Sequence, residues 1–289
     1  PVVVLNVQRG GPSTGLPTKA EQTDLLSAVY GRHGEAPVPV LAPSTPGDCF
    51  FMVLEAFRLA MKYMTPVIVL SDGGLANASE PWKIPDEGQL PDLAPTFHTD
   101  PENFSPYARN PETLGRNWAI PGTPGLEHRL GGLEKDSFTG EISYEPENHE
   151  KMVFLRNEKI QRIVKDLPSL EIVGPEKNEL LVVSWGSVYG PAFSAIDELQ
   201  TEGHSVSMLH LRHLNPLQEN LGELLSNFEK VLVPEMNLGQ LSRLLRAEYL
   251  VDVISFSKLQ GRPFLVSEIR NRILELLGES RKNKSCRDS

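Results

Sequence analysis

Cysteine is scarce in this sequence. Its 289 residues include only two cysteines, Cys49 and Cys286. Two thiols are too few to ligate an iron–sulfur cluster or to build a disulfide framework. We expect Cys49 to lie in the core, on an apolar helix, and Cys286 to lie in a polar tail. Any redox centre that works with this chain is therefore expected on another chain.

An excess of positive charge and long apolar runs are also missing. The chain has 28 Lys and Arg against 38 Asp and Glu, a formal net charge of −10. Nucleic-acid binding normally needs a basic patch, so this balance argues against it. Apolar stretches such as 67–70 and 180–183 are far shorter than the ~20 residues of a membrane span. We therefore expect a cytoplasmic protein that contacts no membrane.

The start of the sequence is unusual. It begins at Pro1, without methionine, directly before the apolar run 2–7, which we predict to be a buried strand. A domain seldom starts inside a core strand. We therefore expect that an amino-terminal portion of the protein precedes this chain.

The first part of the chain alternates strand and helix patterns. We predict strands at 2–7, 38–41 and 66–70, and helices at 19–30 and about 45–64, the second of them packed on two sides. This alternation is typical of a parallel sheet with helices on both faces. A second α/β unit follows, for which we predict strands at 180–184, 205–210 and 230–234, a turn at 214–217, and helices at 191–202, 221–228 and 239–249.

The segment between the two units, about 77–148, is dense in proline and glycine and carries scattered aromatic residues. Long irregular segments are commonly functional or interaction surfaces. We predict an ordered excursion that covers another surface, followed by a helix at 150–167. The predicted domains are therefore 1–170, including this insertion, and 178–278, with a flexible tail at 279–289.

A glycine-rich loop follows the first predicted strand. It contains Arg9, Ser13 and Thr14 among glycines, and residues 18–21 have the form of a helix-capping box. Ligands bind at the carboxyl ends of strands in open α/β sheets. A guanidinium with free amides suits an anion. From these residues alone, a surface turn whose arginine pairs with a carboxylate is equally plausible.

Four motifs, in the same order, resemble those of one family. They are residues 8–18 (QRGGPSTGLPT), 120–134 (IPGTPGLEHRLGGLE), 234–241 (PEMNLGQL) and 261–264 (GRPF). The chain resembles the alpha subunits of 2-oxoacid:ferredoxin oxidoreductases, above all the 2-oxoglutarate type, from Val2 to about Leu277. The resemblance implies an α/β fold, with a thiamine-diphosphate-binding, pyrimidine-type domain followed by a transketolase C-terminal-like domain.

The resemblance also implies a reaction. A 2-oxoacid and coenzyme A become an acyl-CoA and CO₂, and the electrons pass to ferredoxin. A beta subunit binds the diphosphate with Mg²⁺ and carries the iron–sulfur cluster, so we expect a hetero-oligomer. Arg9 would recognise the 2-oxoacid carboxylate, with Thr14 and Ser13 assisting. The glutamate that activates the cofactor belongs to a segment upstream of Pro1, so we assign no catalytic residue here and expect this chain alone to be inactive.

Structural roles are favoured for the other polar candidates. We expect Asp72 to cap the turn after its strand rather than to line a cleft. Hydrogen bonds within loops are expected for Glu127, His128 and His149. Structural roles are also expected for His210, His213, residues 185–187, Glu235 and Asn237.

Two alternatives stay open. The substrate could be pyruvate or a branched-chain 2-oxoacid on the same scaffold. The chain could also be a non-catalytic assembly subunit that kept the fold and lost the cofactor glutamate.

Overall fold

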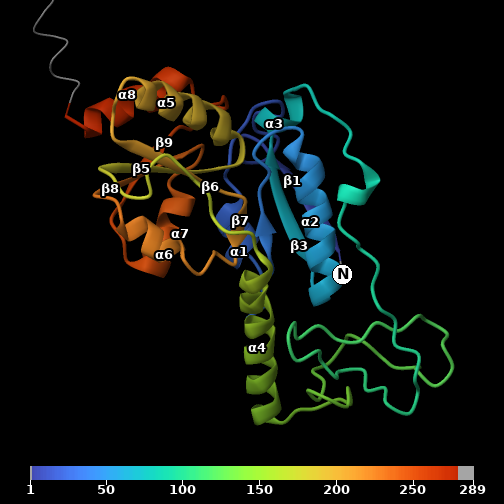
Figure 1. Cartoon of the computed structure of the whole chain (residues 1–289). Helices are drawn as coiled ribbons and strands as arrows, with labels where there is room; N and C mark the ends of the chain where they lie inside the picture. The colour runs from blue at the N-terminus through green and yellow to red at the C-terminus, as the bar shows by residue number, and fades with distance from the viewer. Residues whose placement is uncertain (1, 279–289) are drawn as a thin grey trace, which may run out of the picture.

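The computed structural model describes residues 2–278, which form two sheets (Figure 1). The first has the order β1-β3-β2-β7. β1 (Val3–Gln8) and β2 (Val40–Leu41) both run parallel to β3 (Val67–Asp72), while β7 (His213–Asn215) runs antiparallel to β2. The first sheet thus includes a strand from the second half of the sequence, in the region where we had predicted only a turn.

The second sheet has the order β4-β6-β5-β8-β9. It is parallel except for the edge strand β4 (Ile172–Val173). The other strands are β5 (Leu180–Trp185), β6 (Val206–Leu211), β8 (Lys230–Glu235) and β9 (Val253–Ser257). The predicted parallel α/β organisation is confirmed in both sheets.

Alternating side chains of the second sheet fill two different cores. In β5, Leu180 and Val182 face α5 (Tyr189–Thr201) and α8 (Val266–Leu276). Leu181, Val183 and Trp185 enter a core that also contains residues of α6 (Leu221–Ser226) and α7 (Gln240–Tyr249). Since successive strand residues point to opposite faces, an unbroken apolar run is what a sheet covered on both sides needs.

The second of these cores joins the two sheets. It includes Leu25 of α1 (Leu25–Tyr30), Val40 of β2 and Leu70 of β3, together with Trp185 and Leu211 of the second sheet. A separate core lies between β3 and α2 (Asp48–Tyr63). The carboxyl ends of both sets of parallel strands are therefore held within one packed structure.

Three predictions of burial are wrong. β1 is the edge of its sheet, and Val4, Leu5 and Val7 are 46–54% exposed. α2 buries one face only, because Phe50, Phe51 and Phe57 on its other side are also exposed, and Cys49 is half-buried rather than in the core. An apolar pattern identifies side chains that avoid water, but it does not say which surface covers them.

The first helix begins later than predicted. Residues 19–24 are not helical, and α1 starts at Leu25. The reason is tertiary: the backbone N–H of Gln22 donates to the carbonyl of Met236 at 3.0 Å, and the carbonyl of Thr23 accepts from Gln240 at 2.7 Å. These bonds occupy backbone groups that a helix would use.

The last part of the fold lay outside the predicted elements. β9 and α8 follow the last helix that the sequence pattern indicated, and both pack into the second unit. The tail predicted at 279–289 lies outside the described residues.

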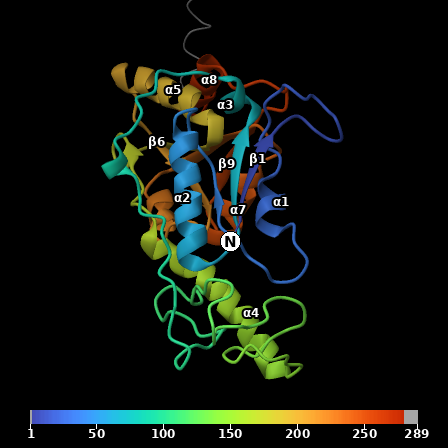
Figure 2. The same ribbon diagram turned by 90° about the vertical axis from the view of Figure 1, so that its right-hand side faces the viewer.

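The segment 77–148 begins where α3 (Gly73–Asn77) ends, and up to residue 145 it has a 3₁₀ turn at Glu87–Gln89 and otherwise irregular backbone. It leads to α4 (Pro146–Gln161), which continues as a 3₁₀ turn at Arg162–Asp166. In both views the segment passes along α2 and then lies beside α4, below the sheets (Figures 1 and 2). Trp82 packs on Phe50 of α2, and Arg109 bonds Met152 of α4. No helix among residues 2–278 has both the length and the apolarity to cross a membrane.

A buried carboxylate caps α7 and provides a test of the fold. Glu235 is fully buried, and it accepts hydrogen bonds from the N–H groups of Leu241 and Ser242 at 2.7 and 3.0 Å. Glu235→Ala is expected to lower the free energy of unfolding by about 2–3 kcal/mol, since hydrogen bonds to a charged group are lost. Urea unfolding measures this loss. Glu248→Ala, at an exposed position of the same helix, should change the free energy of unfolding by less than about 0.5 kcal/mol. Equal effects of the two substitutions would refute the role of Glu235.

Candidate functional site

The candidate site is the loop that follows β1 at the carboxyl edge of the first sheet. β1 ends at Gln8, in register with Asp72 at the end of β3. The chain then makes an excursion from Arg9 to Asp24 before α1 begins. The predicted order of strand and glycine-rich loop is therefore present, at the edge where such folds bind ligands.

Backbone hydrogen bonds close this loop. The N–H of Leu16 donates to the carbonyl of Gly10 at 2.7 Å, and the N–H of Gly10 donates to the carbonyl of Lys19 at 3.2 Å. Gly15 has φ +49°, and a Cβ there would lie 2.1 Å from the Gly10 carbonyl oxygen. Only glycine fits that position. Ser13 is also left-handed, with φ +58°, an uncommon conformation for a residue with a side chain.

Arg9, Ser13 and Thr14 all lie on this closed loop and are exposed. Within residues 2–278, none of the three side chains makes a hydrogen bond or an ion pair. The guanidinium thus keeps its five N–H donors available. The structure puts the three predicted residues on one short loop, but it shows no contact among them.

The sequence analysis missed the residues that anchor the loop. The Gln8 side chain is 1% exposed; its Nε2 donates to the carbonyl of Ser71 at 3.1 Å, and its Oε1 accepts from the N–H of Asp24 at 3.0 Å. Gln8 therefore clamps both ends of the excursion. Period-2 alternation puts Gln8 on the same side of β1 as Val4 and Asn6, so the local pattern gives no sign that Gln8 is buried.

Asp72 has the capping role that we expected. Its carboxylate accepts from the N–H groups of Gly74 at 2.7 Å and Leu75 at 3.3 Å, and from Ser187 at 3.2 Å. Burial raises the pKa of this carboxyl, while the hydrogen bonds from Ser187, Gly74 and Leu75 oppose the rise. The acid links the first sheet to the turn after β5 and is not free to bind a ligand.

His128 and His149 have structural partners. His128 Nδ1 bonds the carbonyl of Leu126 at 2.7 Å, which confirms the expected hydrogen bond within a loop. His149 lies on α4 rather than in the irregular segment, and it pairs at 2.8 Å with Glu134 of that segment. For Glu127 no contact tests the expectation.

His210 on β6 and His213 on β7 also contact protein groups. His210 bonds Ser184 at 2.8 Å, and burial lowers its pKa to about 3, so its ring is neutral. His213 lies 3.5 Å from Glu55. Among the described residues, no group of three or more His, Cys, Asp or Glu side chains could hold a metal ion.

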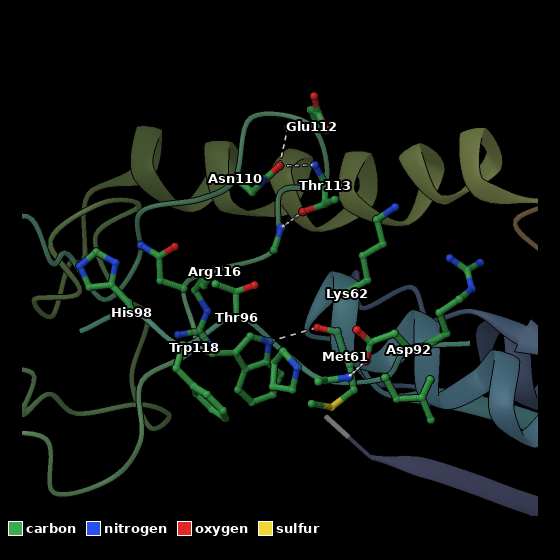
Figure 3. Close-up of a pocket in the computed structure, with 17 residues that line it drawn as sticks. Met61, Lys62, Asp92, Thr96, His98, Asn110, Glu112, Thr113, Arg116 and Trp118 are labelled. Carbon is green, nitrogen blue, oxygen red and sulfur yellow. Dashed lines mark hydrogen bonds between the residues drawn. The ribbon is translucent and has the colours of Figure 1, made fainter. Parts of the chain in front are cut away.

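A cavity of about 700 Å³ lies far from the loop, between the carboxyl-terminal half of α2 and the irregular segment (Figure 3). α2 runs back from the carboxyl edge of the first sheet, so this cavity is near the amino ends of the strands. Trp118, which lines the cavity, donates to the carbonyl of Met61 at 3.1 Å and so holds the irregular segment against α2. Lys62 pairs with Asp166 at 2.6 Å and joins α2 to the 3₁₀ turn after α4.

Several cations gather at this cavity, and one of them, Arg116, lines it. The guanidinium carbons of Arg116 and Arg109 lie 4.8 and 5.8 Å from the ring centre of Tyr107. Lys159 of α4 lies close to them and donates to the carbonyl of Met64 at 3.2 Å. Burial, followed by repulsion from Arg116, Arg109 and Arg156, lowers the pKa of Lys159 to about 8. The cluster joins α4 to the irregular segment, although its like charges repel one another.

Two parts of the chain match models of known protein families. Residues 1–145 match the family model for the thiamine-diphosphate-binding part of pyruvate flavodoxin/ferredoxin oxidoreductases, and residues 178–269 match core domain II of pyruvate:ferredoxin oxidoreductase. The chain belongs to the 2-oxoacid:ferredoxin oxidoreductase alpha-subunit family. The resemblance carried by the four sequence motifs is thereby confirmed, as is the thiamine-diphosphate-binding type of the first unit.

Members of this family with curated names show considerable identity. The chain is 57% identical over 93% of its length to the 2-oxoglutarate oxidoreductase subunit KorA of Mycobacterium tuberculosis, covering 41% of that protein. It is 31% identical over 95% of its length to the 2-oxoglutarate synthase subunit KorA of Methanothermobacter marburgensis, covering 73% of it.

A solved family member has the same fold. The 2-oxoglutarate:ferredoxin oxidoreductase from Magnetococcus marinus, solved with 2-oxoglutarate, coenzyme A and succinyl-CoA bound, matches 96% of this chain with a TM-score of 0.91 and 35% identity. The match covers 49% of that chain. The present chain thus spans less than half the length of the Mycobacterium and Magnetococcus family members.

The lowered pKa of Lys159 gives a pH-dependent prediction. Between pH 8 and about 10.5, the unfolded chain keeps this proton while the folded chain releases it, so the contribution of Lys159 to stability rises with pH in this window. Lys159→Met removes the titration, and its stability relative to wild type should therefore fall from pH 7 to pH 10. Thermal unfolding at several pH values measures this trend. Lys165→Met, at an exposed position nearby, is the control, and a pH-independent difference for Lys159→Met would rule out the effect.

Proposed function

We propose that this chain is the substrate-recognition part of a 2-oxoacid:ferredoxin oxidoreductase that acts on 2-oxoglutarate. The reaction is oxidative decarboxylation: 2-oxoglutarate and coenzyme A give succinyl-CoA and CO₂, and two electrons pass to ferredoxin. The observation that carries the proposal is the exposed, unpaired Arg9 on a closed loop at the carboxyl edge of the first sheet. The names of the family members support the choice of reaction.

Arg9 has the chemistry that a 2-oxoacid requires. A carboxylate is planar, and a guanidinium can donate two parallel hydrogen bonds to it. Ser13 and Thr14, exposed on the same loop, can add hydroxyl donors. Holding the carboxylate fixes the position of the neighbouring keto carbon, which is catalysis by orientation.

The cofactor in this proposal is thiamine diphosphate, which supplies the electron sink for decarboxylation. Asp72 and Glu235, two buried carboxylates at the carboxyl edges, are already bonded to backbone amides, so neither is free for the aminopyrimidine ring. A third buried carboxylate, Glu21, lies on the loop itself and makes no hydrogen bond or ion pair within residues 2–278. We therefore assign no cofactor-activating role to Asp72 or Glu235.

The partner in this proposal is a beta subunit, which binds the diphosphate with Mg²⁺ and carries an iron–sulfur cluster. The complex would be cytoplasmic. Apolar side chains that the described chain leaves uncovered support a second subunit. Tyr144, before α4, is 79% exposed, and Phe154 on α4 is 65% exposed. Exposed apolar side chains of this kind are typical of interaction surfaces.

The choice of 2-oxoglutarate over pyruvate rests on the names of the family members, while the family model for residues 1–145 is described by pyruvate. Steady-state kcat/KM values for 2-oxoglutarate, pyruvate and a branched-chain 2-oxoacid decide between them. A complex that prefers pyruvate or a branched-chain acid would exclude 2-oxoglutarate as the substrate.

Removing the guanidinium tests the carboxylate assignment directly. In the complete complex, Arg9→Ala is expected to raise KM for the 2-oxoacid about 10- to 100-fold, since hydrogen bonds to a charged group are worth about 1.5–3 kcal/mol. Arg9→Lys keeps the positive charge but loses the forked guanidinium, so its KM should lie between those of the wild type and of Arg9→Ala. Arg243→Ala, at an exposed position on α7, is the control. Unchanged kinetics in Arg9→Ala would exclude Arg9 from substrate binding.

The partner surface can be tested separately. The double substitution of Tyr144 and Phe154 by Asp should reduce co-purification of a co-expressed beta subunit while the thermal midpoint of the chain stays within about 2 °C, because exposed positions contribute little to folding. Leu265→Asp, at an exposed apolar position in the second unit, should not affect co-purification. Equal recovery of the partner with all variants would place the interface elsewhere.

A further inference from the structure

Gln22 connects the candidate substrate loop to the second sheet. It is 0% exposed. Its Nε2 donates to the carbonyl of Trp185 at 2.9 Å, and its Oε1 accepts from the N–H of Met236 at 3.1 Å. Its backbone N–H donates to the carbonyl of Met236 at 3.0 Å, and its carbonyl accepts from Nδ2 of Asn237 at 2.8 Å. All of its polar groups thus bond residues at the carboxyl ends of β5 and β8.

Gln240 extends this contact along the chain. Its Nε2 donates to the carbonyl of Thr23 at 2.7 Å, and its Oε1 accepts from the N–H of Leu26 at 3.0 Å. Residues 236–240 belong to the motif 234–241, which the substrate and cofactor assignments leave without a role. The motif therefore binds the segment that connects the substrate loop to α1.

The loop is held at its two ends and is otherwise exposed. Gln8, at the first end, bonds the carbonyl of Ser71 and also the N–H of Asp24 at the second end. At the second end, Gln22 bonds the second sheet. A residue of the second unit also touches the loop itself, because a Cβ on Gly261 would lie 2.9 Å from Cβ of Lys19 and 3.0 Å from Cδ1 of Leu16. The place of the loop is therefore set jointly by both units.

We propose that Gln22 is a positioning residue for Arg9: through Trp185, Met236 and Asn237 it sets where the loop presents the guanidinium. This inference rests on the proposed function of Arg9 in binding the 2-oxoacid. An exposed arginine has a long, mobile side chain, so the backbone beneath it has to be fixed if the fork is to meet a carboxylate in one orientation. Misplacement by about 1 Å is enough to reduce catalysis about 100-fold.

The variant that tests this role is Gln22→Leu, which keeps the size of the side chain and removes its two hydrogen bonds. Gln218→Leu is the matched control, because Gln218 is also buried but its side chain makes no hydrogen bond to the loop. Asn237→Ala is a second variant: it removes the bond to the Gln22 carbonyl and the bond from the Gln240 N–H, and leaves the Gln22 side chain in place. It keeps the test available if Gln22→Leu does not fold.

The measurement is a double-mutant cycle with Arg9→Ala in the complete complex with its beta subunit. Gln22→Leu is expected to raise KM for 2-oxoglutarate about tenfold in the wild-type background and less than about twofold in the Arg9→Ala background, since the two residues would act as one unit. Asn237→Ala should show the same pattern. A residue that only stabilised the fold would affect both backgrounds equally.

The outcomes separate this inference from the proposed function. If Arg9→Ala raises KM but the effect of Gln22→Leu or Asn237→Ala is the same in both backgrounds, or matches that of Gln218→Leu, the positioning role is wrong and the carboxylate assignment survives. If Arg9→Ala leaves KM unchanged, the carboxylate assignment is wrong, and the positioning role is overturned with it.

Discussion

The rest of the structure depends on satisfying the buried polar groups where the carboxyl ends of the two sheets meet. The carbonyl of Trp185 and the N–H of Met236 end two central strands of the second sheet, and both bond the Gln22 side chain. The N–H of Ser187 bonds Asp72 of the first sheet. A buried group left without a partner costs about 1–3 kcal/mol. These bonds can form together in only one relative placement of the sheets.

Apolar packing holds the same two sheets together. The shared core brings Leu25, Val40 and Leu70 against Trp185 and the inward residues of the second sheet. Hydrophobic burial is strong but has no direction. It draws the two sheets together, and the hydrogen bonds at Gln22 and Asp72 then fix their register. The positions of the loop after β1 and of the motif 234–241 follow from this single junction.

This division between packing and polar contacts explains how far the sequence could predict the fold. The strands of the second unit are continuous apolar runs, and β5, β6 and β8 lie within a residue or two of their predicted ranges. The late start of α1 could not be predicted, because its cause lies more than 200 residues away in Met236 and Gln240. Arg9 could be identified from local chemistry and resemblance, whereas Gln22 is a polar residue whose role exists only in three dimensions.

The exposed residues show a second limit on what the sequence pattern predicts. The pattern of β1 is that of a buried strand, yet Val4, Leu5 and Val7 face solvent in the described chain. The buried carboxylates Asp72 and Glu235 are fully engaged in the fold, while Arg9 is exposed and unpaired. Buried polar groups such as Gln8 and Gln22 therefore hold the backbone of the loop in place, and the cationic group and apolar surface stay accessible. A fixed backbone under a mobile side chain limits where the guanidinium can reach, and its exposure leaves it open to an anion from solvent.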